Sequence, residues 1–160
     1  MGLGALFYST FEKQLDAKRR IVVPQEFRAA ASGPFDGVIC FPSVEADCIE
    51  GGGQARLDTY LGVIKELAVG EPLRTALETT VIGGLCRLAY DTAGRITLPE
   101  ALCDRFGLND WVAVVGMGEH FQIWPRDAFQ AWREQQHQIA RQGLPAFRAQ
   151  QRLTRTGAGQ

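Results

Sequence analysis

The nine residues Asp16-Ala17-Lys18-Arg19-Arg20-Ile21-Val22-Val23-Pro24 return 75 positions later as Asp91-Thr92-Ala93-Gly94-Arg95-Ile96-Thr97-Leu98-Pro99. Both stretches follow the pattern Asp-x-x-x-Arg-Ile-x-aliphatic-Pro. An internal repeat predicts that the chain contains two copies of one supersecondary unit rather than one irregular domain. The fold and the function are therefore expected to follow from what that unit does twice.

Each copy is expected to form a strand, a turn, a second strand and a short helix. In the first copy, residues 5–15 are rich in β-forming residues, and the β-branched run 21–23 makes the returning strand. Pro24 ends that strand and suits the first position of a helix, where its missing N–H is not needed. In the second copy, Gly94 tolerates positive φ in the turn, and Gly107 is expected to end the helix.

After its helix, each copy returns to a β-like run, at residues 35–42 in the first copy and 118–125 in the second. These runs align only if the second copy carries eight extra residues. We therefore expect an added strand at 108–115 in the second copy.

The segments outside the repeats are expected to be mainly helical. Glycines 51–53 predict a flexible linker that leads into one helix over residues 57–68 and another over 72–80. The longest helix is expected over 126–142, because a glycine and Pro145 follow it and are typical of a helix end. The last residues of the chain are expected to be disordered.

The composition is that of a soluble globular protein. With 46% hydrophobic and 22% charged residues, the 160 residues suffice for one ordinary domain or two small ones that share a core. No run approaches the roughly eighteen apolar residues of a membrane span, and no secretion signal is recognisable. We therefore expect a cytoplasmic protein with no membrane partner.

The sequence contains few of the residues and motifs that are typical of metal sites or catalytic sites. Its four cysteines form no Cys-x-x-Cys pair, so neither a metal site nor a disulfide framework is expected. His120 and His137 are interpreted as incidental, and no P-loop, dinucleotide or nucleophile motif occurs. We therefore expect no enzyme, no cofactor, no metal and no small-molecule substrate. The cysteines are Cys40, Cys48, Cys86 and Cys103.

Charge is unevenly distributed along the chain, although the net charge is −1. Residues 1–28 carry five basic and three acidic side chains, net +2, and residues 126–160 carry six and two, net +4. Residues 29–125 carry six basic and thirteen acidic side chains, net −7. Such a chain can present a basic face to an anionic partner, but a solvated tail with no target explains residues 126–160 equally well.

The Asp and the Arg of each repeat are expected to face one another across a short turn. A salt bridge or a turn-capping hydrogen bond explains Asp16 and Asp91 as well as a functional role does. Arg20 is harder to explain in this way, because Lys18 and Arg19 place two further cations beside it. Like charges crowded on one loop cost stability, so we expect an anionic partner, with phosphate the obvious group.

A ribbon of two strands with basic side chains at its tip has about the right width for the major groove of B-DNA. Arginine can there make bidentate hydrogen bonds to guanine O6 and N7. Arg28, in the helix that follows the first ribbon strand, is placed to contact the DNA backbone. The sequence therefore favours a loop that reads DNA.

Further motifs accompany the repeat: the lead-in Phe11-Glu12-Lys13-Gln14-Leu15-Asp16, the segment Val23-Pro24-x-x-Phe27-Arg28 and the late Phe121-x-Ile123-Trp124. Together with the paired repeat elements, they resemble the MraZ family, bacterial transcriptional regulators of the division and cell-wall gene cluster. The resemblance covers about residues 5–140.

The resemblance implies an α+β fold of the AbrB-like, swapped-hairpin superfamily. In that fold two repeats interlock into one small β-barrel with pseudo-twofold symmetry; here both repeats come from one chain, with peripheral helices added. The expected organisation is a first repeat at 5–50, a helical linker at 51–82, a second repeat at 83–125, a C-terminal helix at 126–143 and a flexible tail at 144–160.

The resemblance also implies a sequence-specific regulator that binds short direct repeats of double-stranded DNA. It would act at the promoter of the division and cell-wall gene cluster, as a homo-oligomeric ring associated with the nucleoid. By position, DNA contact falls to Lys18 and Arg20 in the first loop and to Arg95 in the second, with Arg28 in support. Family members usually carry Gly in place of Arg19, so either the turn is reshaped here or Arg19 adds a phosphate contact to the DNA-binding set.

A protein-interaction module is the alternative interpretation. An AbrB-like antitoxin or scaffold would pair its hairpins in the same way and use its basic tail to bind a protein, without an operator of its own. Salt dependence separates the two, because binding through several phosphates weakens steeply with ionic strength and hydrophobic docking does not.

Overall fold

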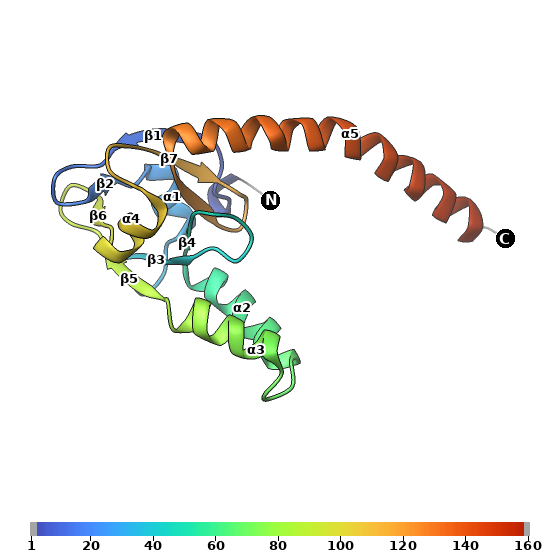
Figure 1. Cartoon of the computed structure of the whole chain (residues 1–160), viewed down its shortest axis with the longest axis horizontal. Coiled ribbons are helices and arrows are strands. Elements are labelled where there is room, and N and C mark those ends of the chain that lie inside the picture. Colours follow the sequence, from blue (N-terminus) through green and yellow to red (C-terminus); the bar gives the residue numbers. More distant parts are fainter. Residues whose placement is uncertain (1–2, 159–160) are drawn as a thin grey trace. The chain divides into compact units, whose positions relative to one another are not determined.

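The computed structural model describes residues 3–158 and divides into two compact units after Arg126 (Figure 1). The first unit contains all the described strands, and the second is the continuation of one long helix, α5 (Arg126–Ala158). In chain order, the elements of the first unit are η1 (Leu3–Ala5), β1 (Thr10–Gln14), β2 (Arg20–Val22), α1 (Gln25–Ala30), β3 (Gly37–Pro42), β4 (Ile49–Gly52), α2 (Gln54–Glu66), α3 (Pro72–Leu77), η2 (Glu78–Ile82), β5 (Cys86–Ala89), β6 (Arg95–Thr97), α4 (Glu100–Phe106), β7 (Trp111–Gly116) and β8 (Phe121–Pro125).

The strands form a six-stranded antiparallel sheet in the order β1-β7-β8-β4-β3-β5, and a separate two-stranded ribbon of β2 and β6. The first strand of each repeat pairs with the third strand of the other, β1 with β7 and β5 with β3. The last strands of the two repeats, β4 and β8, pair at the centre. Exchanging the two repeats therefore leaves the strand order unchanged, and neither repeat completes its sheet alone.

The expected α+β class with an antiparallel sheet is confirmed. Among the described residues, however, the sheet does not close into a barrel. Its two outermost strands are β1 and β5, which lie at opposite edges, and the β2–β6 ribbon is a separate sheet.

The segment 108–115 does contain a strand, β7, but it is not an addition to the second repeat as expected. Each repeat has two strands after its short helix, β3 and β4 in the first and β7 and β8 in the second. The run 35–42 corresponds to β7 and not to residues 118–125. The strand that corresponds to β8 is β4, which is hard to recognise because it has only four residues, two of them glycines that resemble a linker. Gly51 and Gly52 are in fact buried strand residues, and a Cβ at Gly51 would collide with the ring of Phe121. Glycine there permits close packing rather than flexibility.

The two helices expected between the repeats are present, with shifted bounds. The first, α2, begins directly after Gly53 and ends at Glu66, and the second, α3, continues into a π-helical turn, η2, up to Ile82. Gly70, with φ of +86°, lies in the connection between them. One apolar cluster joins this hairpin to β3. Its members are Ile39, Phe41, Tyr60, Ile64, Leu77 and Val81.

Helix α5 does not end near Gly143 as expected, because it runs through Pro145 to Ala158. A proline inside a helix removes one backbone hydrogen bond and costs about 3 kcal/mol. The run 146–152, with its alanine, arginine and glutamine residues, favours helix on the C-terminal side of that proline. Of the expected flexible tail, residues 144–158 are thus helical, and 159–160 lie outside the described residues. Within residues 3–158, no helix combines the length and the apolar character needed to cross a bilayer.

Phe27 of α1 lies at the centre of the core. Its ring centroid is 5.4 Å from those of Phe7 and Phe121 and 5.5 Å from that of Phe11. Phe121 belongs to the second repeat and the other rings to the first, so this cluster holds the two repeats together.

We expect Phe27→Ala to lower the free energy of unfolding by about 3–5 kcal/mol, because the fully buried ring leaves a cavity between the repeats. Urea denaturation followed by circular dichroism measures the change. Phe147→Ala is the control, because this phenylalanine on α5 is 55% exposed and its removal should change stability little. Equal effects of the two substitutions would contradict this account of the core.

Candidate nucleic-acid interface

The first repeat loop is closed by the side chain of Asp16. Its Oδ1 accepts hydrogen bonds from the backbone N–H groups of Lys18, at 2.9 Å, and Arg20, at 2.8 Å. Its Oδ2 accepts a third from Nε of Arg20, at 2.6 Å. One carboxylate thus fixes both the turn and the arginine that follows it, an arrangement that we call the aspartate clamp.

The second repeat loop contains the same clamp. Oδ1 of Asp91 accepts hydrogen bonds from the backbone N–H groups of Ala93 and Arg95, both at 2.9 Å, and Oδ2 accepts one from Nε of Arg95, at 2.7 Å. The turn-capping and salt-bridging interpretation of the two aspartates is therefore correct. This interpretation accounts for Nε of Arg20 and Arg95 but not for their Nη groups.

Both clamps are ionised at neutral pH. The backbone N–H of Arg20 and then its side chain hold the pKa of Asp16 below its ordinary value, against an opposing effect of burial, and Arg95 does the same for Asp91. A carboxylate whose pKa is lowered by folding adds stability above the pKa of the unfolded chain, and this stability is lost as the pH falls through the lowered folded value. The clamps are therefore weakened only in acid.

Arg20 and Arg95 lie on the same outer face of the β2–β6 ribbon. In the register of the ribbon, Ile21 pairs with Ile96, and both side chains are 1% exposed, so this face points into the core. The flanking residues must then point outward, because side chains alternate along a strand. The outward set consists of Arg20, Val22, Arg95 and Thr97.

The clamps leave the outer part of each guanidinium available. The side chains of Arg20 and Arg95 are 30% and 32% exposed. Only Nε of each is bound to the aspartate, and within residues 3–158 the Nη atoms have no hydrogen-bonding partner. Each arginine therefore presents two oriented donor groups to solvent, and Lys18 is exposed beside the first of them.

Arg19 adopts the left-handed conformation that glycine adopts in the second loop. Its φ is +59°, and that of the equivalent Gly94 is +75°. The turn is therefore not reshaped by the arginine. The backbone carbonyl of Arg19 accepts a hydrogen bond from the N–H of Leu98, and that of Gly94 accepts one from Val23, so each loop is joined to the strand of the other repeat.

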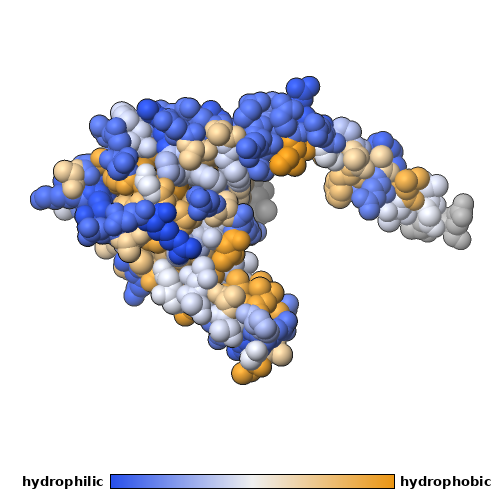
Figure 2. Space-filling view, in the orientation of Figure 1, coloured by the Kyte–Doolittle hydropathy of each residue, from blue (hydrophilic) through white to orange (hydrophobic). Residues whose placement is uncertain are grey.

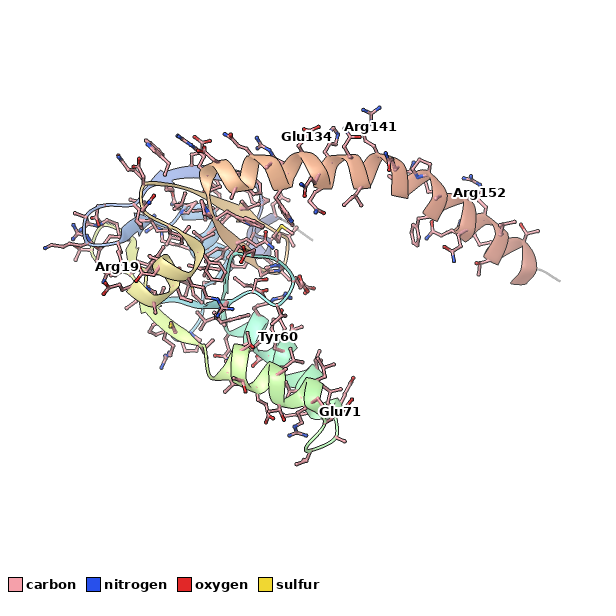
Figure 3. All side chains as sticks on the ribbon, in the orientation of Figure 1. Arg19, Tyr60, Glu71, Glu134, Arg141 and Arg152 are labelled. Atoms are coloured by element: carbon pink, nitrogen blue, oxygen red, sulfur yellow. The ribbon has the colours of Figure 1, made fainter. Side chains whose placement is uncertain are left out.

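The side chain of Arg19 is only partly available to a partner, because its Nε donates to the backbone carbonyl of Leu98 at 3.1 Å. Figure 3 places Arg19 at the end of the first unit where β2 and β6 lie. The arginine thus cross-links the two repeats as well as adding a positive charge to the first loop.

Arg28 lies against the second loop, not on the outer face of the ribbon. A Cβ at Gly94 would come within 2.7 Å of its Nη1. Its Nε is buried and has no partner in the described residues, and the same is true of the hydroxyl of Tyr90. Both residues line a cavity of about 300 Å³ beside Asp91. Burial raises the pKa of Tyr90 to about 12, so its hydroxyl stays a hydrogen-bond donor at neutral pH.

Two arginines of the first repeat, Arg19 and Arg28, correspond to the smaller Gly94 and Cys103 in the second. The residue equivalent to Arg28 in α4 is Cys103, which is buried. Burial raises the pKa of its thiol, and the charge of Arg19 opposes this in part. Cys103 lies near enough to Arg19 of the first loop to feel its charge, and the large Arg28 lies against Gly94 of the second loop. Each loop therefore has one supporting guanidinium, supplied by the loop in one case and by α1 in the other.

The register of the ribbon places Arg20 and Arg95 on one face, whereas Lys18 is exposed in the preceding loop and Arg19 and Arg28 contact the other repeat. Sequence reasoning missed Val22 and Thr97, although the buried isoleucines between them and the arginines indicate by alternation that both face outward. It also missed Tyr90, for which the sequence gives no signal. Figure 2 shows hydrophilic residues gathered at the ribbon end of the first unit.

The chain is similar to known proteins along most of its length. A family model described as "MraZ protein, putative antitoxin-like" matches residues 82–153. Proteins named "Transcriptional regulator MraZ" match more fully: that of Phenylobacterium zucineum is 70% identical over 150 residues, 94% of each chain. That of Caulobacter vibrioides is 67% identical over 154 residues, 96% of this chain and 99% of the relative. That of Hyphomonas neptunium is 32% identical over 161 residues, 96% and 98% of the two chains.

Gly94→Ala should destabilise the fold by at least about 1–2 kcal/mol, because a side chain at positive φ is strained and this one would also displace Arg28. The matched substitution Arg19→Gly should leave stability nearly unchanged. The substitution removes the hydrogen bond to Leu98 and gives the unfolded chain more conformational freedom, and both effects destabilise the fold. It also removes the strain of a side chain at positive φ, which offsets them. Thermal unfolding of both variants measures the difference. Equal melting temperatures would contradict the conclusion that glycine is needed at position 94 but not at position 19.

Proposed function

The chain belongs to the MraZ family of transcriptional regulators, and from this premise we propose that it binds double-stranded DNA sequence-specifically through the outer face of the β2–β6 ribbon. The observation that carries the proposal is the pair of aspartate clamps, which hold Arg20 and Arg95 on one face with their Nη groups free of other described residues. A two-stranded ribbon is among the elements that fit the major groove of B-DNA.

The clamps orient the two arginines in a way that favours base recognition. Free arginine side chains lose rotamer entropy on binding, whereas a guanidinium already held at Nε presents its remaining donors in a fixed direction. Two such donors match O6 and N7 of guanine. Val22 and Thr97, beside the arginines, can pack against a thymine methyl group. Lys18 and Arg19 would add phosphate contacts that position the ribbon without reading sequence.

Arg28 has a supporting role in this proposal. It would hold the second loop through Gly94, and its Nε is buried, like the hydroxyl of Tyr90 beside the same cavity. In this proposal Arg20 and Arg95 read bases, Lys18 and Arg19 add phosphate contacts, and Arg28 supports the second loop from behind the ribbon face.

We infer further that the two repeats are AbrB-like swapped hairpins related by a pseudo-twofold axis. The unchanged strand order on exchange of the repeats supports this, and so do the reciprocal hydrogen bonds from each loop to the other repeat. The first repeat then extends through β4 to Gly52 rather than ending at residue 50, and the second occupies residues 83–125, with α2 and α3 inserted between them.

The proposed biological role is regulation at the promoter of the division and cell-wall gene cluster, through short direct repeats, in the cytoplasm at the nucleoid. We propose a homo-oligomeric ring, because a single ribbon neutralises few phosphates and several linked ribbons raise the effective concentration of each further contact. A heterologous interface that closes on itself presents identical ribbons in one direction, which suits direct repeats. No catalytic step is part of this role.

The second candidate is a protein-interaction module of the antitoxin or scaffold kind. One observation favours it: the helical hairpin exposes Val63, Val69 and Leu73, with 45%, 87% and 53% of their surfaces accessible. Figure 2 shows hydrophobic patches among hydrophilic residues at the α2–α3 end of the first unit. This apolar surface is remote from the ribbon, so it can coexist with DNA binding.

Arg20→Ala should weaken binding to DNA from upstream of the gene by about tenfold or more, because one bidentate base contact is worth about 1–3 kcal/mol. Fluorescence anisotropy measures the affinity, and light scattering confirms that the assembly is unchanged. Lys65→Ala is the control, because this exposed cation lies on α2, away from the ribbon. Unaltered affinity with an intact assembly would exclude the ribbon as the DNA-binding surface.

Arg20→Lys tests the clamp separately from the charge. Lysine keeps the positive charge but lacks the planar fork, so affinity for the specific site should fall about tenfold while affinity for a scrambled duplex stays the same. Competition between the two duplexes, measured at two salt concentrations, gives the specificity ratio. If the ratio is unchanged, the arginine acts through charge alone and the oriented fork plays no part.

A further inference from the structure

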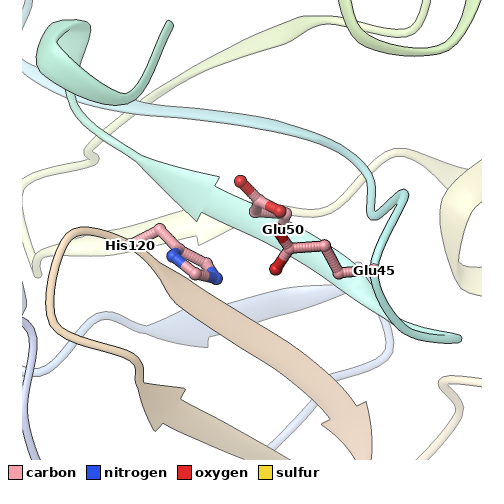
Figure 4. Close-up of side chains that lie close together, drawn as sticks. All are labelled: Glu45, Glu50 and His120. Carbon is pink, nitrogen blue, oxygen red and sulfur yellow. The ribbon is translucent and has the colours of Figure 1, made fainter. Parts of the chain in front are cut away.

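Three potential metal ligands converge on the first unit away from the ribbon. They are Glu45 in the loop between β3 and β4, Glu50 in β4 and His120 in the turn before β8. One ligand atom from each lies within 4.8 Å of the other two. Figure 4 shows the imidazole of His120 directed toward the two carboxylates.

The buried and unpartnered imidazole of His120 distinguishes this group from an ordinary acidic cluster. It is 6% exposed, and neither Nδ1 nor Nε2 has a hydrogen-bonding partner among the described residues. A buried polar atom left without a partner costs about 1–3 kcal/mol. An imidazole nitrogen without another partner is available as a metal ligand.

Glu50 is fixed in place by its neighbours. It is fully buried, its Oε2 accepts a hydrogen bond from Nε of Arg56 at 2.5 Å, and its Oε1 accepts one from the hydroxyl of Tyr60 at 3.3 Å. Carboxylates that ligate metals are commonly held in this way by further hydrogen bonds. Glu45, by contrast, is exposed and free to adjust its position.

The charge around the group is negative and unbalanced. Glu45 and Glu50 carry two negative charges, and Arg56 carries one positive charge that is shared with Glu119, at 3.9 Å from its Nη1. A dication would neutralise the excess. One imidazole nitrogen and two carboxylate oxygens suit Zn²⁺ and similar transition-metal ions better than Ca²⁺ or Mg²⁺, which prefer all-oxygen sites.

We propose that Glu45, Glu50 and His120 form a binding site for one transition-metal dication of the Zn²⁺ type, with water completing its coordination. Two of the ligands come from the first repeat and one from the second, next to the β4–β8 pairing at the centre of the sheet. The ion therefore fastens the two repeats to one another. Its role is to stabilise the fold, separate from the proposed DNA contact at the ribbon.

The test uses the full chain, stripped with a chelator and titrated with ZnCl₂ by isothermal calorimetry. We expect one ion per chain, and at about a hundred times Kd a rise in melting temperature of about 5–10 °C that the chelator reverses. Glu45→Gln should weaken binding by at least about tenfold. It is the primary variant, because replacing an exposed side chain leaves the core intact whereas replacing His120 risks unfolding.

Two controls and one spectroscopic measurement complete the experiment. His137→Gln on α5 removes the other histidine, and Glu66→Gln removes an exposed carboxylate on α2; neither should change the affinity. In ¹⁵N spectra of the histidine rings, Zn²⁺ should shift a nitrogen of His120 and leave His137 unaltered. The proposal is overturned if the stripped chain does not bind Zn²⁺, if binding survives Glu45→Gln undiminished, or if His120 does not respond.

Discussion

The aspartate clamp is the interaction on which the two repeat loops, and so the candidate interface, depend. Backbone and side-chain hydrogen bonds to one ionised carboxylate close each loop and set the direction of the next arginine. Hydrogen bonds to a charged acceptor are about twice as strong as neutral ones, so a short loop is ordered without a large core of its own. Because Asp and Arg are four residues apart in both repeats, the same geometry is built twice, and the ribbon carries two equivalent arginines.

The repeats are not independent domains joined by a linker. Each lends its first strand to the other, each loop carbonyl accepts a hydrogen bond from the opposite repeat, and Phe27 packs on Phe121 between them. In the first loop, Arg19 occupies the left-handed position and donates a hydrogen bond to the carbonyl of Leu98 in the other repeat, whereas in the second loop Gly94 leaves room for Arg28.

Local features of this fold could be predicted from the sequence, and non-local ones could not. The loops, the ribbon strands and the short helices follow from spacing, since Asp-x-x-x-Arg and Ile-x-aliphatic-Pro each specify a local geometry. Gly51 and Gly52 were misassigned because only pairing with β3 and β8 makes them strand residues. His120 gave no signal for the same reason: its burial and its approach to Glu45 and Glu50 are set by the central β4–β8 pairing.

The clamps also bear on how a chain of net charge −1 could engage a polyanion. An arginine paired with an aspartate adds no net charge, so it contributes little to the release of counterions that drives nonspecific binding. Such an arginine can still contribute to sequence recognition, because its free donors have a fixed direction toward the base edges. In the proposed complex, specificity would then come mainly from Arg20 and Arg95, and salt-dependent affinity from Lys18 and Arg19. One chain supplies few such charges, and so the electrostatic part of binding depends on how many ribbons engage the DNA together.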